Sequence, residues 1–133
     1  MTDPVEYLGL EDLVSLAALL LGDPPPIRDV GLLGSAAARS RTSAFGSDAY
    51  PDLRAKAAAL LQSIVNNHAL VDGNKRLGWL ATAVFLELNG VDVTTATNDD
   101  VYDLVMDVAA GDDDVEQISK RLRALIPGGA SKR

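Results

Sequence analysis

Apolar residues recur every three or four positions along most of the chain, and short polar breaks separate the periodic segments. This spacing predicts amphipathic helices. The expected helices are Leu10–Leu21, 27–38, one that starts at Tyr50-Pro51-Asp52 and ends at Asn67, one over 77–88 with its first turn at 74–76, one that ends at Ala110, and Val115–Leu125. We therefore predict an all-α fold, a compact bundle of about six helices in a single domain over residues 1–127. Residues 128–133 are expected to form a mobile tail.

Two segments between the helices lack a helical period. Residues 40–47 should form a loop that contains a short extended piece at Thr42-Ser43-Ala44-Phe45. Residues 91–95 alternate between apolar and polar side chains, which is typical of an edge strand, and the extended piece at 42–45 is its candidate partner.

The segment 77–88 is apolar on nearly every side, apart from Thr82 and Glu87. A helix that is hydrophobic all round is normally buried. We expect it to run through the middle of the domain and to hold the loop before it rigidly.

Composition agrees with packed helices and narrows the possible partners. The chain is 47% hydrophobic but only 5% aromatic, so its core must be built from Ala, Leu and Val. It has no cysteine, which suits a reducing cytoplasm, and no apolar run of membrane-spanning length. Nucleic acid is an unfavoured partner, because 12 basic residues face 19 acidic ones and the net charge is -7, and the lack of a spanning run disfavours a membrane.

The chemistry-bearing residues gather in one stretch, 68–76, between two predicted helices. It holds the chain's single histidine, His68, then Asp72 and Gly73, either of which could cap the next helix, and then Asn74, Lys75 and Arg76. Two cations in a first helical turn are unfavourable unless an anion compensates them. A bound phosphate would do so, using the free amides of the helix start as well, and Asp72 could hold a divalent cation.

Plainer interpretations exist for these residues. Asp72 could merely cap the helix, with Lys75 and Arg76 in water and His68 filling a gap. The stretch is not a glycine-rich P-loop, because Gly73 has no second glycine upstream at the required spacing. The acidic run Asp112 to Asp114 could suggest a metal site, but a cap and a solvated turn are the better interpretation.

The stretch resembles the motif of the Fic/Doc proteins. That motif reads His, Pro, Phe, any residue, Asp or Glu, Gly, Asn, Gly, Arg, with a second Arg three residues later. His68, Asp72, Gly73, Asn74 and Arg76 match it, and Lys75 matches the Doc branch, which has Lys at the second glycine. Further matches lie between Ile27 and Gly90: Asp29-Val30-Gly31-Leu32-Leu33, Ala44-Phe45-Gly46, Tyr50-Pro51-Asp52-Leu53 and Lys56-Ala57-Ala58.

The resemblance implies a Fic/Doc-type helical bundle and a role for each residue of the motif. His68 would be the general base, and Asp72 would hold Mg²⁺. The nucleotide's phosphates would be bound by Gly73, Asn74, Lys75 and Arg76. The nucleotide would be ATP or another nucleoside triphosphate. Thr42, Ser43, Ala44 and Phe45 would form the flap that aligns the protein target.

Three residues depart from the motif. Ala69 replaces Pro, and Leu70 replaces the Phe that anchors the loop, so a looser anchor is expected. Trp79 stands in place of the second Arg, which in AMP-transferring members contacts the nucleotide phosphates. With Lys75, this favours transfer of the terminal phosphate to a protein hydroxyl, as in the Doc toxins, over AMP transfer.

The Doc resemblance also implies partners: a separate antitoxin protein, and elongation factor Tu as the candidate target, whose phosphorylation stops translation. The sequence has no clear inhibitory motif of its own. A nucleotidyl transferase and a non-catalytic nucleotide- or partner-binding module remain the alternatives, and Leu70 and Trp79 favour the second of them.

Overall fold

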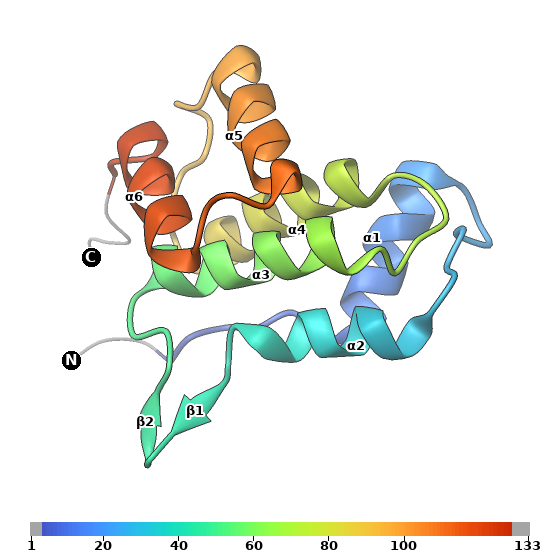
Figure 1. Cartoon of the computed structure of the whole chain (residues 1–133), viewed down its shortest axis with the longest axis horizontal. Helices are drawn as coiled ribbons and strands as arrows, with labels where there is room; N and C mark the ends of the chain where they lie inside the picture. The colour runs from blue at the N-terminus through green and yellow to red at the C-terminus, as the bar shows by residue number, and fades with distance from the viewer. Residues whose placement is uncertain (1–3, 129–133) are drawn as a thin grey trace.

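The computed structural model describes residues 4–128, and within that range almost all regular structure is helical (Figure 1). The elements are α1 (Leu10–Leu21), α2 (Val30–Arg39), β1 (Ser43–Ala44), β2 (Ser47–Asp48), α3 (Leu53–Asn67), α4 (Asn74–Leu88), α5 (Asn98–Ala110) and α6 (Val115–Leu125). The predicted all-α bundle of about six helices with a short hairpin is confirmed for this range. Apart from Gly128, the predicted tail lies outside the described residues.

Helices α3 and α4 form the centre of the bundle, and the other helices pack around them (Figure 1). Small residues bring the two helices close together. A Cβ at Gly78 of α4 would lie only 2.7 Å from a methyl group of Val65 on α3, so only glycine fits there. Ala57, Ala58 and Phe85 are fully buried at the same centre. This close contact fixes the relative position of the end of α3 and the start of α4.

Helix α4 is not buried on every side, which corrects the expectation from its sequence. Its half-buried residues include Trp79, Leu80 and Ala83, and Leu88 near its end is 52% exposed. Periodicity could not show this, because an apolar face looks the same whether another helix covers it or leaves it open.

Two predicted helix boundaries shift because of their caps. The predicted 27–38 helix begins at Val30, because the carboxylate of Asp29 accepts a hydrogen bond from the amide of Leu32 at 3.1 Å and caps the helix start. Likewise Asp52 caps α3 by accepting from the amide of Ala55 at 2.8 Å. Pro51 was expected in the first turn of this helix and instead lies just before it.

The edge strand predicted at 91–95 is absent from the described structure. Its backbone groups are used locally instead. The amide of Val91 donates to the carbonyl of Leu86 at 2.9 Å, and that of Val93 donates to the Glu87 carboxylate at 3.1 Å. Asp92 accepts from both the amide and the hydroxyl of Thr94, which lowers the pKa of the Asp92 carboxyl. The alternation that predicted a strand reflects the burial of Val91 and, in part, Val93.

Candidate active site

The segment 68–73 joins α3 to α4 and is held against the chain that precedes α2. The carbonyl of Ala69 accepts hydrogen bonds from the amides of Arg28 and Asp29 at 2.8 and 3.0 Å, and the amide of Val71 donates to the carbonyl of Pro26 at 2.8 Å. Between these bonds, Leu70 and Ile27 form an antiparallel bridge. The segment is therefore fixed by tertiary hydrogen bonds on its outer side.

A second clamp holds the same segment from α4. The side-chain amide of Asn74 accepts from the amide of Leu70 at 3.0 Å and donates to its carbonyl at 3.1 Å. The Leu70 side chain is only 2% exposed, so the apolar anchor survives the change from Phe. The side-chain amide of Asn74 thus holds the loop backbone at Leu70, and its predicted contact with phosphate stays a prediction. In this geometry it shapes the site.

His68 closes α3 in the left-handed region, with φ of 56° and ψ of 42°. This conformation costs a non-glycine residue roughly 1–2 kcal/mol and persists only where the surroundings impose it. The guanidinium of Arg28 contributes to that constraint, because it donates a hydrogen bond to the His68 carbonyl. The imidazole makes no hydrogen bond to the described part of the chain, and the residue is exposed. It is free to meet a substrate.

Arg28 was not among the site residues predicted from the sequence. No local signal could have revealed it. The residue lies 40 positions from His68, and only the bridge between Ile27 and Leu70 brings the two together.

Gly73 caps α4 with φ of 89°, which decides between the two predicted caps. Any Cβ here would lie 2.7 Å from the end of Leu21 on α1. The left-handed backbone favours glycine at this position, and a Cβ would also have to displace the end of the Leu21 side chain. The neighbouring Asp72 does not cap the helix. Among the described residues, its exposed carboxylate accepts only from the Gly73 amide, at 2.9 Å.

The start of α4 carries unpaired positive charge. The first hydrogen bond of the helix runs from the amide of Leu77 to the carbonyl of Gly73, and the amides of residues 74–76 have no acceptor among the described residues. Lys75 and Arg76 are exposed and form no ion pair within the range 4–128. Free amides, the positive end of the helix dipole and two cations together make an anion site. They fit the phosphates of a nucleotide.

Comparison with known proteins agrees with this geometry. The family model described as "Fic/DOC family" matches residues 7–86, which span α1 to most of α4. A curated protein named "Toxin Doc", from Mycolicibacterium smegmatis, is 46% identical over 118 residues, covering 88% of this chain and 91% of that protein. The chain belongs to the Fic/DOC family.

Asp72, where a metal was expected, offers a single exposed carboxylate. Among the described residues there is no group of three or more His, Cys, Asp or Glu side chains that could hold a metal ion alone. A lone carboxylate suits Mg²⁺, which keeps several waters and is usually bound through one or two carboxylates plus substrate phosphates. In this Fic/DOC protein, Asp72 could therefore hold Mg²⁺ only together with a bound nucleotide.

The segment predicted to act as the flap forms a two-stranded hairpin. Ser43 pairs with Asp48 and Ala44 with Ser47, and Phe45 and Gly46 form the turn with φ of 54° and 81°. All of residues 41–49 are exposed, including the Phe45 ring at the tip. Of the four predicted flap residues, Ser43 and Ala44 form β1, Thr42 precedes it, and Phe45 forms the turn.

The base of the flap is tied to α3 by Lys56, whose side chain is 1% exposed. Its ammonium group donates to the carboxylate of Asp48 at 3.0 Å and to the carbonyl of Tyr50 at 2.6 Å. Burial lowers the pKa of Lys56, but hydrogen bonds to Asp48 and Tyr7 outweigh it and the pKa is raised. One helix therefore carries the flap anchor near its start and His68 at its end.

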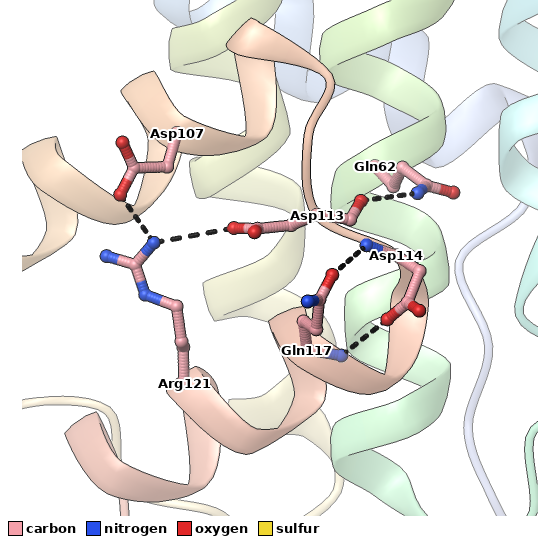
Figure 2. Close-up of polar contacts among 6 residues, drawn as sticks. All are labelled: Gln62, Asp107, Asp113, Asp114, Gln117 and Arg121. Atoms are coloured by element: carbon pink, nitrogen blue, oxygen red, sulfur yellow. Dashed lines mark hydrogen bonds and ion pairs between the residues drawn. The ribbon is translucent and has the colours of Figure 1, made fainter.

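In the acidic run before α6, the expected cap is present at Asp114, whereas Asp113 forms an ion pair that the sequence did not predict (Figure 2). Asp114 accepts from the amide of Gln117 at 2.8 Å, and the Gln117 side chain accepts from the amide of Asp114 at 2.8 Å. Asp113 faces Arg121 at 3.5 Å, and the same guanidinium contacts Asp107 of α5 at 2.6 Å. These groups satisfy one another.

In the described part of the chain, no helix combines the length and the apolar character that crossing a membrane would require.

Proposed function

We propose that this protein transfers the terminal phosphate of a nucleoside triphosphate, ATP in the first instance, to a Ser or Thr hydroxyl of a protein target. The observation that carries the proposal is the start of α4, where Lys75, Arg76 and three free amides have no partner among the described residues. Trp79, one turn further along α4, leaves no cation for the inner phosphates of a nucleotide held as in the AMP-transferring members.

His68 is the general base of this reaction. It accepts the proton from the attacking hydroxyl, while a bond forms from that oxygen to the terminal phosphorus and the bond to the bridging oxygen of the diphosphate breaks. A neutral imidazole is suited to this task, because its ordinary pKa lies near the working pH. The left-handed backbone of His68 and its contact with Arg28 set the direction in which the ring can point.

The start of α4 supplies the electrostatic part of catalysis. Its amides, with Lys75 and Arg76, meet the charge that spreads over the transferring phosphate. Asp72 would hold Mg²⁺, which supplies charge neutralisation of the nucleotide phosphates when bound. Asn74 fixes the loop through Leu70 and keeps His68 and the helix start in register.

The biological setting that we propose is a toxin-antitoxin pair. It rests on the relative named "Toxin Doc", which nearly the whole chain matches. The target would be a translation factor, with elongation factor Tu as the first candidate. A separate antitoxin would neutralise the protein through a helix that folds onto an apolar groove. The protein would act in the cytoplasm. Its expression without the antitoxin should arrest cell growth, and harmless expression would contradict the toxin role.

A labelling experiment tests the chemistry. ATP labelled at its gamma phosphate, incubated with the protein and a cell extract, should label a protein in the extract. ATP labelled at alpha should not, and the variant His68→Ala should give no label with either. Label from alpha alone would make the protein a nucleotidyl transferase. No His68-dependent label from either would favour a non-catalytic module, although the buried Leu70 anchor removes one of the two features that pointed to such a module.

A further inference from the structure

The hairpin formed by residues 43–48 stands away from the helical bundle, near the start of α3 (Figure 1). Each strand has only two residues, and every residue of the hairpin is exposed. A two-stranded hairpin without a packed hydrophobic face is at best marginally stable by itself. Its position relative to the bundle therefore depends on the few contacts that join it to the helices.

One side chain supplies the contact with α3. Among the described residues, the only side-chain hydrogen bond that leaves the hairpin joins Asp48 to the ammonium group of Lys56, at 3.0 Å. The same ammonium group donates to the carbonyl of Tyr50 at 2.6 Å and lies 5.6 Å from the centre of the Tyr7 ring. Lys56 thus connects α3 with the chain before α1, with the hairpin and with the residues that follow the hairpin.

An ion pair is not needed merely to fill this position. The Lys56 side chain is 1% exposed, and burying an ammonium group carries a desolvation penalty that a well-packed apolar side chain of similar volume avoids. The pair is therefore a poor device for stability alone. An apolar residue at position 56 could not fix the place of the Asp48 carboxylate, and with it the direction in which the hairpin projects.

The hairpin has two features of a contact surface. At its tip, the Phe45 ring is fully exposed and the residue has φ of 54°, a left-handed conformation that bulky residues rarely adopt and that is concentrated at functional sites. Beside its base, Arg41 is exposed and forms no ion pair within residues 4–128. A protein surface with an apolar hollow and a nearby carboxylate would complement both.

The hairpin is remote from the reacting groups. His68 follows Lys56 by 12 residues, so about 18 Å of helix rise separates the two along α3. The hairpin projects further still, at the opposite end of α3 from the loop that leads to α4 (Figure 1). A partner that meets both the hairpin and the His68 ring must present a surface wider than this distance. A folded protein does so, and a short peptide does not.

We propose that Lys56 is a positioning residue for the protein target: through Asp48 it holds the hairpin as a rigid second contact, remote from His68, on which the folded target docks. The proposal rests on the proposed function and adds how the target is held. A hairpin that is already fixed loses little conformational freedom when the target binds, so the pair strengthens target binding. It does not act on bond making, because Lys56 lies near the other end of α3 from His68.

The rate of gamma-label transfer, measured over a dilution series of cell extract, separates target binding from chemistry. The double variant Lys56→Met with Asp48→Ala leaves no unpaired charge in the buried position, so its urea midpoint should stay close to that of the parent. Its apparent KM for the labelled protein should nevertheless rise about tenfold, with kcat changed less than about twofold. Hydrogen exchange of the Ala49 amide, which donates to the carbonyl of Thr42 at 2.8 Å, should become faster.

Two single variants complete the experiment. Asp48→Ala leaves the Lys56 ammonium group buried without its carboxylate, so it should lower the urea midpoint as well as raise the KM. Asp107→Ala is the matched control, because it removes a carboxylate from an ion pair with Arg121 that lies between α5 and α6, and it should leave the KM unchanged. All three variants should bind Mg-ATP with the affinity of the parent in calorimetric titrations.

Three outcomes would overturn the proposal. If the KM of the double variant equals that of the parent, the pair serves stability only. If exchange of the Ala49 amide is unchanged, Lys56 does not hold the hairpin. A lower kcat at unchanged KM would place the effect at the reacting groups instead of at docking. In each case, gamma label that still depends on His68 leaves the proposed phosphate transfer standing, whereas a parent that transfers no label overturns the proposed function and this inference with it.

Discussion

Two helices in this protein, α4 and α6, begin just after an aspartate, but the polar groups at their starts are satisfied to different degrees. Before α6, Asp114 and Gln117 cap one another's backbone amides, and Arg121 is shared by Asp107 and Asp113 (Figure 2). Before α4, glycine is the cap, Asp72 bonds only to the next amide, and Lys75 and Arg76 extend from the positive end of the dipole. Within residues 4–128, the polar groups at the start of α6 find partners, whereas the cations and free amides at the start of α4 do not.

The difference teaches where to look for a ligand. A chain that can cap α6 with its own side chains could do the same at α4, so charge left unmatched there is better explained by an external anion than by poor design. The backbone at the α4 start supports this view. It is clamped by Asn74, by residues 26–29 and by the space around Gly73, so the unmatched groups are held still. Rigid backbone under free polar groups is what a binding site requires.

The largest effect should come from removing the base. His68→Ala should lower the rate of label transfer by about 10²- to 10⁴-fold, the usual contribution of general base catalysis, and should relieve growth arrest. Gln117→Ala, which breaks the capping box of α6, should leave the rate unchanged and cost about 1 kcal/mol of stability. The two variants are compared by initial rates of gamma labelling and by urea denaturation.

Full activity of His68→Ala would remove this residue from the mechanism. Circular dichroism of the variant guards against a trivial loss through unfolding.

The second prediction compares the stability costs of two glycine substitutions, and separates the effect of limited space from that of backbone conformation at Gly73. Gly73 and Gly111 have nearly equal φ, 89° and 84°, but a Cβ at Gly111 meets nothing within 4 Å. Gly111→Ala should therefore cost roughly 1–2 kcal/mol for the left-handed backbone alone. Gly73→Ala should cost roughly 2–4 kcal/mol, because its Cβ also overlaps Leu21. Urea denaturation of both variants measures the difference. Equal costs would mean that Leu21 moves aside freely.

The sequence predicted most of the fold, because helix periodicity and caps are local. The bounds of α1 and α6 agree with the structure, and α4 begins at Asn74 as its cations and Gly73 suggested. The errors arose where tertiary contacts decide. Ile27 lies outside the helix predicted for it and forms a bridge with Leu70. Residues 91–95 form no strand, and the amide of Val91 bonds to the end of α4 instead.

The candidate site divides along the same line. The identity of the residues in 68–76 was visible as a motif, but what each side chain does depends on neighbours far away in sequence. Arg28 donates to the His68 carbonyl, the end of the Leu21 side chain lies where a Cβ at Gly73 would stand, and Lys56 ties the hairpin to α3. None of these contacts leaves a periodic or compositional signal. The open face of α4 was equally invisible, because apolar residues were taken to mean burial.

A smaller effect tests the carboxylates of the two starts. Asp72→Asn should weaken binding of Mg-ATP about tenfold, and should change the free energy of unfolding by less than about 0.5 kcal/mol, because Asp72 does not cap α4. Asp114→Asn removes the same charge where the side chain is a cap. Asn caps nearly as well as Asp, so both stability and ATP affinity should stay close to the parent. Calorimetric titration with and without Mg²⁺ checks both. An Asp72→Asn variant with the parent's Mg-dependence would mean that the carboxylate holds no metal.

The smallest expected effect is a gain of stability when a cation at the start of α4 is removed. Lys75 lies in the first turn of α4, where a cation opposes the helix dipole. Without a nucleotide, Lys75→Gln should raise the free energy of unfolding by about 0.3–1 kcal/mol and at the same time weaken ATP binding. The ammonium group of Lys120 in α6 lies 3.8 Å from the Glu116 carboxylate, so Lys120→Gln should lower stability by about 0.3 kcal/mol and leave ATP binding unchanged.

Urea denaturation at low salt measures both changes in the free energy of unfolding. With added tripolyphosphate, the parent should become more stable than Lys75→Gln, because the parent gains more from the bound anion. A Lys75→Gln variant that is less stable than the parent without any ligand would mean that the chain itself already compensates this cation.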